Sequence, residues 1–149
     1  MRAVIQRVKH SRVTVDDEVV GEIGAGLLVL LGVTHDDDNK AADFLVDKIV
    51  NLRIFSDADG KMNLSLADTG GEMLVVSQFT LYGSTSRGRR PSFIEAASGE
   101  AALSLYEYFV AKARETVSKV ATGKFGAMMD VELVNDGPVT IILDTKNSI

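Results

Sequence analysis

The chain has 149 residues, a formal net charge of −5 at neutral pH and no cysteine. Hydrophobic residues make up 46% of it and charged residues 25%, which is typical of a globular protein and excludes a disordered or fibrous chain. The missing cysteines exclude a disulfide scaffold, a thiolate zinc site and a cysteine nucleophile. The acidic balance argues against a protein that coats nucleic acid, because neutralising phosphates requires many Lys and Arg side chains.

The first third of the chain is predicted to form strands. Ala3–Val8 alternates apolar and polar residues, and Val13–Val15 and Val19–Val20 flank the acidic turn Asp16–Glu18 like the arms of a hairpin. Leu27–Val33 is apolar at nearly every position and so predicts a central strand that is buried on both faces.

Two amphipathic helices are predicted. The first begins after three aspartates at 36–38, which suit a helix N-terminus, and carries an apolar stripe made of Ala41, Leu45, Ile49 and Leu52. The second runs from about Glu100 to Val117, with one apolar face made of Tyr106, Phe109, Val110, Ala113 and Val117.

Further short strands are predicted at 53–55, 63–66, 73–79, 129–134 and 139–143, with a turn at 135–138 between the last two. This order predicts an α/β fold in which residues 1–149 form a single compact domain. We expect a largely antiparallel, barrel-like sheet with two main helices packed on it. The apolar run at 27–33 is too short to span a bilayer, and no signal-peptide pattern occurs, so we expect a cytoplasmic protein.

Conventional catalytic and metal-binding patterns are missing. The two histidines, His10 and His35, lie in no recognisable motif, so a serine–histidine–acid triad is not indicated. The aspartates at 36–38 could suggest a hard-metal site, but helix capping explains them better. Asp57–Gly60 begins like a calcium loop, lacks the later ligands, and therefore predicts a turn. We expect no metal and no cofactor.

Polar side chains interrupt an apolar stretch at Ser77-Gln78-Phe79-Thr80. Burying such groups without partners costs about 1–3 kcal/mol each, so they should face a pocket or a hydrogen-bonded network. An edge strand with one solvated face would explain them equally well.

Two other segments are unusual on local grounds. In Asn135–Thr140, the pair Gly137-Pro138 fits an ordinary turn but is also a plausible place for a cis peptide bond. Arg87, Arg89 and Arg90 gather within four positions of a Gly/Ser-rich loop. They could hold a phosphate or carboxylate, or could simply be solvated.

The segments Ser77–Leu81 and Asn135–Thr140 resemble the two signature motifs of the D-aminoacyl-tRNA deacylases. The resemblance extends in order along nearly the whole chain and includes residues 1–8, 26–33, 51–55, 60–66, 90–93 and 123–127. Small departures from the common family wording occur at 83–87 and 128–129.

The resemblance implies a homodimeric chiral-proofreading hydrolase with its active site at the dimer interface. Such an enzyme cleaves the ester between a D-amino acid and the 3′-terminal adenosine of tRNA, and also clears glycine wrongly attached to alanine tRNA. The implied partners are aminoacylated tRNA and a second copy of the chain, with no DNA, no membrane and no cofactor.

The resemblance also implies roles for individual residues. Ser77, Gln78, Phe79 and Thr80 would line the catalytic pocket for the aminoacyl-adenosine end. Gly137-Pro138 would be a cis dipeptide inserted into the partner's pocket. Phe125 and Met129 would bind substrate near that pocket. Arg87, Arg89 and Arg90 are candidates for contact with RNA, the alternative being a loop that faces solvent.

Mirror-image amino acids carry the same side chain, so rejecting one hand needs rigid groups close to the α-carbon. Thr80 has no His or Lys in a matching motif to activate it as a nucleophile. The resemblance favours a mechanism in which the ribose 2′-hydroxyl assists water attack, with backbone N–H groups near Phe79 and Thr80 stabilising the oxyanion. The alternatives are a non-catalytic tRNA-end binding module, a small-molecule serine esterase that depends on Ser77, and a structural dimer without a ligand.

Overall fold

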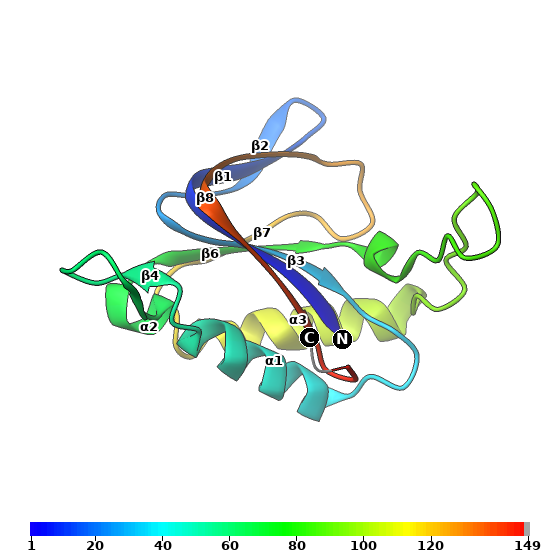
Figure 1. Ribbon diagram of the computed structural model, residues 1–149. Coiled ribbons are helices and arrows are strands. Elements are labelled where there is room, and N and C mark those ends of the chain that lie inside the picture. Colours follow the sequence, from blue (N-terminus) through cyan, green and yellow to red (C-terminus); the bar gives the residue numbers. More distant parts are fainter. Residues whose placement is uncertain (148–149) are drawn as a thin grey trace.

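The computed structural model describes residues 1–147, in which six strands form one mixed sheet (Figure 1). The strand order is β2-β1-β3-β6-β7, and β8 pairs with β1 along nearly its whole length. β1 is antiparallel to β2, β3 and β8, whereas β3–β6 and β6–β7 are parallel pairs. The bounds are β1 (Arg2–Val15), β2 (Glu18–Ile23), β3 (Gly26–Gly32), β6 (Glu72–Ser77), β7 (Val120–Thr122) and β8 (Asp130–Asp144).

The sheet curls until β2 lies against β7. At this contact Gly21 packs on the backbone of Thr122, and a Cβ at Gly21 would lie only 2.2 Å from the Thr122 carbonyl oxygen. Glycine is the one residue that permits such a close approach. The closure gives the barrel-like core that was expected.

Helices α1 (Asn39–Asn51) and α3 (Gly99–Arg114) pack together on one face of the sheet (Figure 1). The Asp38 carboxylate caps α1 by accepting a hydrogen bond from the Ala41 amide at 2.9 Å. The smaller elements are β4 (Phe55–Ser56), β5 (Met62–Leu64), α2 (Leu66–Thr69) and the 3₁₀ turn η1 (Phe79–Tyr82). No helix within residues 1–147 is long and apolar enough to cross a membrane.

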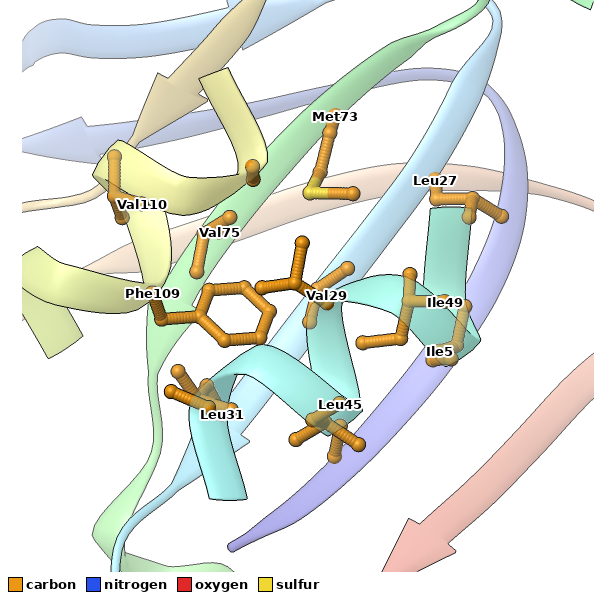
Figure 2. Packing of buried hydrophobic residues seen from close by; sticks show 14 of the residues in the cluster. Ile5, Leu27, Val29, Leu31, Leu45, Ile49, Met73, Val75, Phe109 and Val110 are labelled. Carbon is orange, nitrogen blue, oxygen red and sulfur yellow. The ribbon is translucent and has the colours of Figure 1, made fainter. Parts of the chain in front are cut away.

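The alternation of β3 explains its apolar sequence. Leu27, Val29 and Leu31 point toward the two helices, where Phe109 is fully buried among them (Figure 2). Leu28 points to the opposite face and joins a second cluster inside the curled sheet. Both faces of this strand are therefore core, as a central strand requires.

Most of the predicted elements are confirmed. The β1–β2 hairpin turns at Asp16 and Asp17, whose φ angles are 49° and 65°. β3 is central between β1 and β6. Both helices form, and the predicted apolar face of α3 is buried.

Several predicted element bounds are wrong, and one short strand was missed. β8 continues through residues 135–138, where a shift in its pairing with β1 replaces the predicted turn. Leu66 begins α2, which a Ser65–Asp68 capping box starts, rather than ending a strand. β6 ends at Ser77 rather than continuing to Phe79, and the short strand β7 was not foreseen.

Candidate active site

A cavity of about 380 Å³ lies where β3 and β6 end and α3 begins. Its walls are mostly apolar, and a few polar groups gather at the end of β6. The lining residues are Leu31, Val33, Ser77, Gln78, Phe79, Phe93, Ala96, Ala97, Ser98, Gly99, Ala102, Tyr106, Phe125 and Gly126.

The local structure at the end of β6 explains why polar residues follow a buried strand. Ser77 is the last residue of β6 and pairs with Leu31 of β3. The Gln78 amide donates to the Leu31 carbonyl at 2.8 Å, after which the chain turns into η1. β6 lies between β3 and β7, so the edge-strand explanation of Ser77-Gln78-Phe79-Thr80 is wrong. Ser77, Gln78 and Phe79 instead line the cavity.

Thr80 lies beside the cavity rather than on its wall. Its hydroxyl oxygen accepts a hydrogen bond from Gln78 Nε2 at 2.5 Å, and its side chain is exposed. His35 Nε2 lies 2.7 Å from the Ile94 carbonyl oxygen, and His10 is exposed on β1. Within residues 1–147 no histidine or lysine is hydrogen-bonded to Thr80 or Ser77, so neither hydroxyl has the partner that a nucleophile needs.

The amides of Phe79 and Thr80 have no hydrogen-bond partner among residues 1–147. They open η1. The first N–H groups of a helical turn have no partner within the turn itself. Two such donors close to a cavity could stabilise negative charge that develops on a carbonyl oxygen.

Aromatic side chains form two walls of the cavity. The Phe79 ring is 56% exposed and meets Phe93 edge-on, with centroids 5.2 Å apart and planes at 73°. Phe125 lies 5.6 Å from Tyr106, between centroids. Burial raises the pKa of Tyr106 to about 12, so its hydroxyl is protonated at neutral pH and donates to the Val75 carbonyl.

The segment Gly137-Pro138 does not line the cavity of its own chain. Both residues are exposed on β8, and the peptide bond between them is cis. Arg7 holds this stretch from one side, because its Nε donates to the Asp136 carbonyl at 3.1 Å and its Nη1 to the Ile54 carbonyl at 2.6 Å. Asn135 Nδ2 lies 3.0 Å from the carbonyl oxygens of Arg7 and Val139.

Met129 also lies away from the cavity. It packs against the cluster inside the curled sheet, and a Cβ at Gly123 would lie 2.7 Å from its sulfur. Of the two apolar residues that the sequence associated with substrate, only Phe125 lines the cavity in the same chain.

Arg87, Arg89 and Arg90 are exposed on a projecting loop at residues 84–92, hereafter the arginine arm (Figure 1). Two backbone hydrogen bonds between Ser84 and Ser92, at 2.8 and 2.9 Å, close the base of the arm. The three arginines form no salt bridge with any carboxylate among residues 1–147.

The acidic segments have structural roles. The Asp38 carboxylate caps α1 and Asp37 accepts from the Thr34 amide at 2.8 Å. The Asp57 carboxylate accepts hydrogen bonds from the amides of Lys61 and Asp59, and these bonds close the predicted turn. The same bonds lower the pKa of Asp57. Among residues 1–147 no group of three His, Asp or Glu side chains is placed to hold a metal ion.

Sequence reasoning missed part of the cavity wall. The Ala96–Gly99 segment and Ala102 belong to no motif, Phe93 was noted only within the resembling segment 90–93, and Tyr106 was predicted only as a core residue of α3. Their spacing gave no signal, because the tertiary fold alone brings the start of α3 to the end of β6.

The sequence profile of the family described as "D-Tyr-tRNA(Tyr) deacylase" matches residues 4–144. The chain belongs to this family. It is 62% identical over 148 residues to a D-aminoacyl-tRNA deacylase of Clostridioides difficile, and the match covers 99% of each chain. It is also 62% identical over 131 residues to a Bacillus subtilis protein named an inactive D-aminoacyl-tRNA deacylase, covering 88% of this chain and 99% of the relative.

A solved structure titled "c-Myc DNA Unwinding Element Binding Protein" has the same fold. It is 44% identical in sequence to this chain, with a TM-score of 0.92, and the match covers 97% of this chain and 98% of the other. The deacylase fold and family that the motifs implied are thus confirmed.

Proposed function

We propose that this protein is a D-aminoacyl-tRNA deacylase that hydrolyses the ester between a D-amino acid and the 3′-terminal adenosine of tRNA. The observation that carries the proposal is the family match over residues 4–144, within which Ser77, Gln78 and Phe79 line the cavity. Its walls suit an aminoacyl-adenosine, which presents an aromatic base, a ribose and an ester. Its location would be the cytoplasm, where aminoacylated tRNA is used.

The active enzyme is a homodimer in this proposal. Gly137 and Pro138 are exposed on one chain and outside its own cavity, which leaves them available to enter the cavity of a second copy. β8 also carries the exposed apolar residues Val134 and Ile142, which are 41% and 48% exposed and suit a subunit interface. Arg7 would fix the direction in which the inserted segment points.

Insertion of Gly137 and Pro138 would account for chiral selection. Backbone groups held close to the α-carbon reject one hand because its side chain would collide with them. Glycine has no side chain to reject, so glycine attached to alanine tRNA would also be a substrate. The nature of the D side chain would matter little.

The chemistry would be water attack on the ester carbonyl. A water oxygen bonds to the carbonyl carbon, and the amides of Phe79 and Thr80 stabilise the resulting oxyanion. The bond to the ribose 3′-oxygen then breaks, releasing the free amino acid and a tRNA with an intact ribose. The ribose 2′-hydroxyl would assist the proton transfers, so Thr80 need not act as a nucleophile.

The arginine arm would contact the phosphates of the acceptor end. Its three guanidinium groups are exposed and unpaired within residues 1–147, and planar guanidinium groups suit phosphate oxygens. The arm is joined to the cavity through Phe93, which lies just past its base and meets Phe79.

A single assay tests the proposal. Matched D- and L-aminoacyl-tRNA are incubated with the protein, and the release of free amino acid is followed in time. Alanine tRNA charged with glycine serves as a third substrate. We expect release from the D and glycine substrates and none from the L substrate. Equal rates on D and L substrates, or no release from any of them, would contradict the proposal.

One observation favours a second candidate, a non-catalytic tRNA-end binding module. The Bacillus subtilis relative, 62% identical over its match, is named inactive. A module of this kind would bind a non-hydrolysable aminoacyl-adenosine analogue yet release no amino acid. The serine esterase alternative is disfavoured because Ser77 has no histidine partner among residues 1–147, and an organophosphate probe that leaves Ser77 unlabelled would dismiss it.

A further inference from the structure

The 3₁₀ turn η1 separates two hollows of the molecule. Its first residue, Phe79, lines the cavity together with Gln78. Its last residue, Tyr82, lines a second and more polar hollow of about 580 Å³. The position of η1 therefore determines where the free amides of Phe79 and Thr80 point.

Arg2 holds η1 from the side of the second hollow. Its Nη1 donates to the Leu81 carbonyl at 2.7 Å, while Nε and Nη2 lie 3.0 and 2.9 Å from Asp144 Oδ2. Its guanidinium carbon also lies 4.7 Å from the centre of the Tyr82 ring. A single side chain thus connects η1 to β1 and β8.

η1 packs closely on the sheet below it. Gly32, the register partner of Arg2 across β1 and β3, lies directly under the turn. A Cβ at Gly32 would lie 3.2 Å from Gln78 O, Leu81 Cβ and Tyr82 Cδ2. η1 therefore packs on Gly32 and is held by the hydrogen bond from Arg2.

We propose that Arg2 is a positioning residue for the hydrolysis and acts through the Leu81 carbonyl. This inference rests on the proposed function. Arg2 is not part of the cavity wall, so it does not touch the bound ester. It keeps η1 in the orientation that aims the two free amides at the ester carbonyl. A displacement of about 1 Å in such a group lowers rates by about 100-fold.

The fork shape of the arginine is essential to this role. A guanidinium group presents its donors in a rigid plane, so it can bond Asp144 and the Leu81 carbonyl at the same time. A lysine at the same position keeps the charge but offers a single ammonium group on a flexible stem. Arg2→Lys therefore keeps an ion pair to β8 and loses the fixed bridge to η1.

The chain supplies a matched control in Arg12. This residue also joins β1 to β8, with Nε 2.9 Å from Glu132 Oε2, but it has no contact with η1. Arg12→Lys changes the same type of ion pair between the same two strands. It separates the loss of a strand-to-strand ion pair from the loss of the hold on η1.

The experiment compares Arg2→Lys, Arg12→Lys and the wild type in single-turnover deacylation of D-aminoacyl-tRNA. We expect Arg2→Lys to lower the single-turnover rate constant by about 10-fold or more, with KM within about twofold, and Arg12→Lys to match the wild type. Hydrogen exchange of the Leu81 and Gly83 amides, which donate to the Gln78 and Thr80 carbonyls, should quicken in Arg2→Lys alone. Asp144→Asn, which leaves Arg2 unanchored, should give the same direction of change and serves where Arg2→Lys does not fold.

Three results would each overturn the inference. The first is a rate constant for Arg2→Lys within twofold of the wild type. The second is a loss of rate that Arg12→Lys shares, and the third is a loss of rate without faster amide exchange in η1. If the wild type releases no amino acid at all, the proposed function fails by itself. The exchange measurement then still decides whether Arg2 holds η1.

Discussion

Ala102 gives a direct test that the cavity binds substrate. It lies on α3, lines the cavity and is 6% exposed, so Ala102→Leu would place a larger side chain inside it. Its neighbour Ala101 is exposed on the same helix, and Ala101→Leu is the matched control. The two variants have the same composition and differ only in where the new side chain lies.

The expected effects on stability and on binding have opposite signs. Leucine adds three carbons, and burying each contributes about 0.8 kcal/mol, while lost rotamer freedom offsets about 0.5–1 kcal/mol in total. The free energy of unfolding of Ala102→Leu should therefore rise by about 1–2 kcal/mol. An overfilled site costs the ligand about 1–3 kcal/mol, so KM should rise by about 5- to 150-fold.

Urea unfolding and steady-state deacylation measure the two quantities on the same samples. Ala101→Leu should change the free energy of unfolding by less than about 0.5 kcal/mol and leave KM unchanged. General damage to the fold would lower stability and activity together in Ala102→Leu. A KM for Ala102→Leu within twofold of that for Ala101→Leu would refute the assignment of the cavity as the substrate site.

Three further predictions follow from individual contacts. Thr80→Val should keep most of the single-turnover rate, because Thr80 has no activating base; a loss above about 1000-fold, as for a removed nucleophile, would contradict this. Replacing all three arginines of the arginine arm by glutamine should reduce the slope of log affinity for tRNA against log salt by about 2–3, and an unchanged slope would show that the arm faces solvent. Partial burial acts to raise the pKa of Asp144, but the hydrogen bonds from the Lys146 amide and Arg2 together outweigh it and hold that pKa below its ordinary value. The stability that Asp144 contributes is thus present above about pH 4 and lost as pH falls through the depressed pKa, so wild type and Asp144→Asn should converge in acid unfolding.

The elements that could be predicted from the sequence are those in which apolar residues recur with a regular period. The two-sided apolar run of β3 and the apolar stripe of α3 were recognisable because burial repeats every two residues in strands and about every 3.6 in helices. The Gly137-Pro138 segment was misplaced as a turn because glycine and proline are common in turns. In the fold, Pro138, which has no backbone N–H, lies where the pairing between β1 and β8 is irregular, and a strand tolerates proline there.

The composition of the cavity could be predicted only in part. The polar Ser77 and Gln78 stood out against an apolar strand, and the deacylase resemblance gave Phe125. Ala102 and Phe93 are chemically ordinary, and only the tertiary fold brings them to the cavity. Arg2 and Leu81 are 79 positions apart in the chain, and no local sequence pattern predicts a contact between residues so far apart.

The mixed sheet also explains how substrate binding and the proposed rejection of L-amino acids can be assigned to different strands. β3 and β6 are parallel, so their carboxyl ends meet at one edge and deliver Leu31, Ser77 and Gln78 to the same cavity. β8 runs antiparallel to β1 and presents Gly137-Pro138 away from that cavity. In the proposed homodimer, a second copy of the chain brings the two together. Mutations in the cavity wall should therefore change the binding of both hands of the substrate, whereas mutations on β8 should change only the discrimination between them.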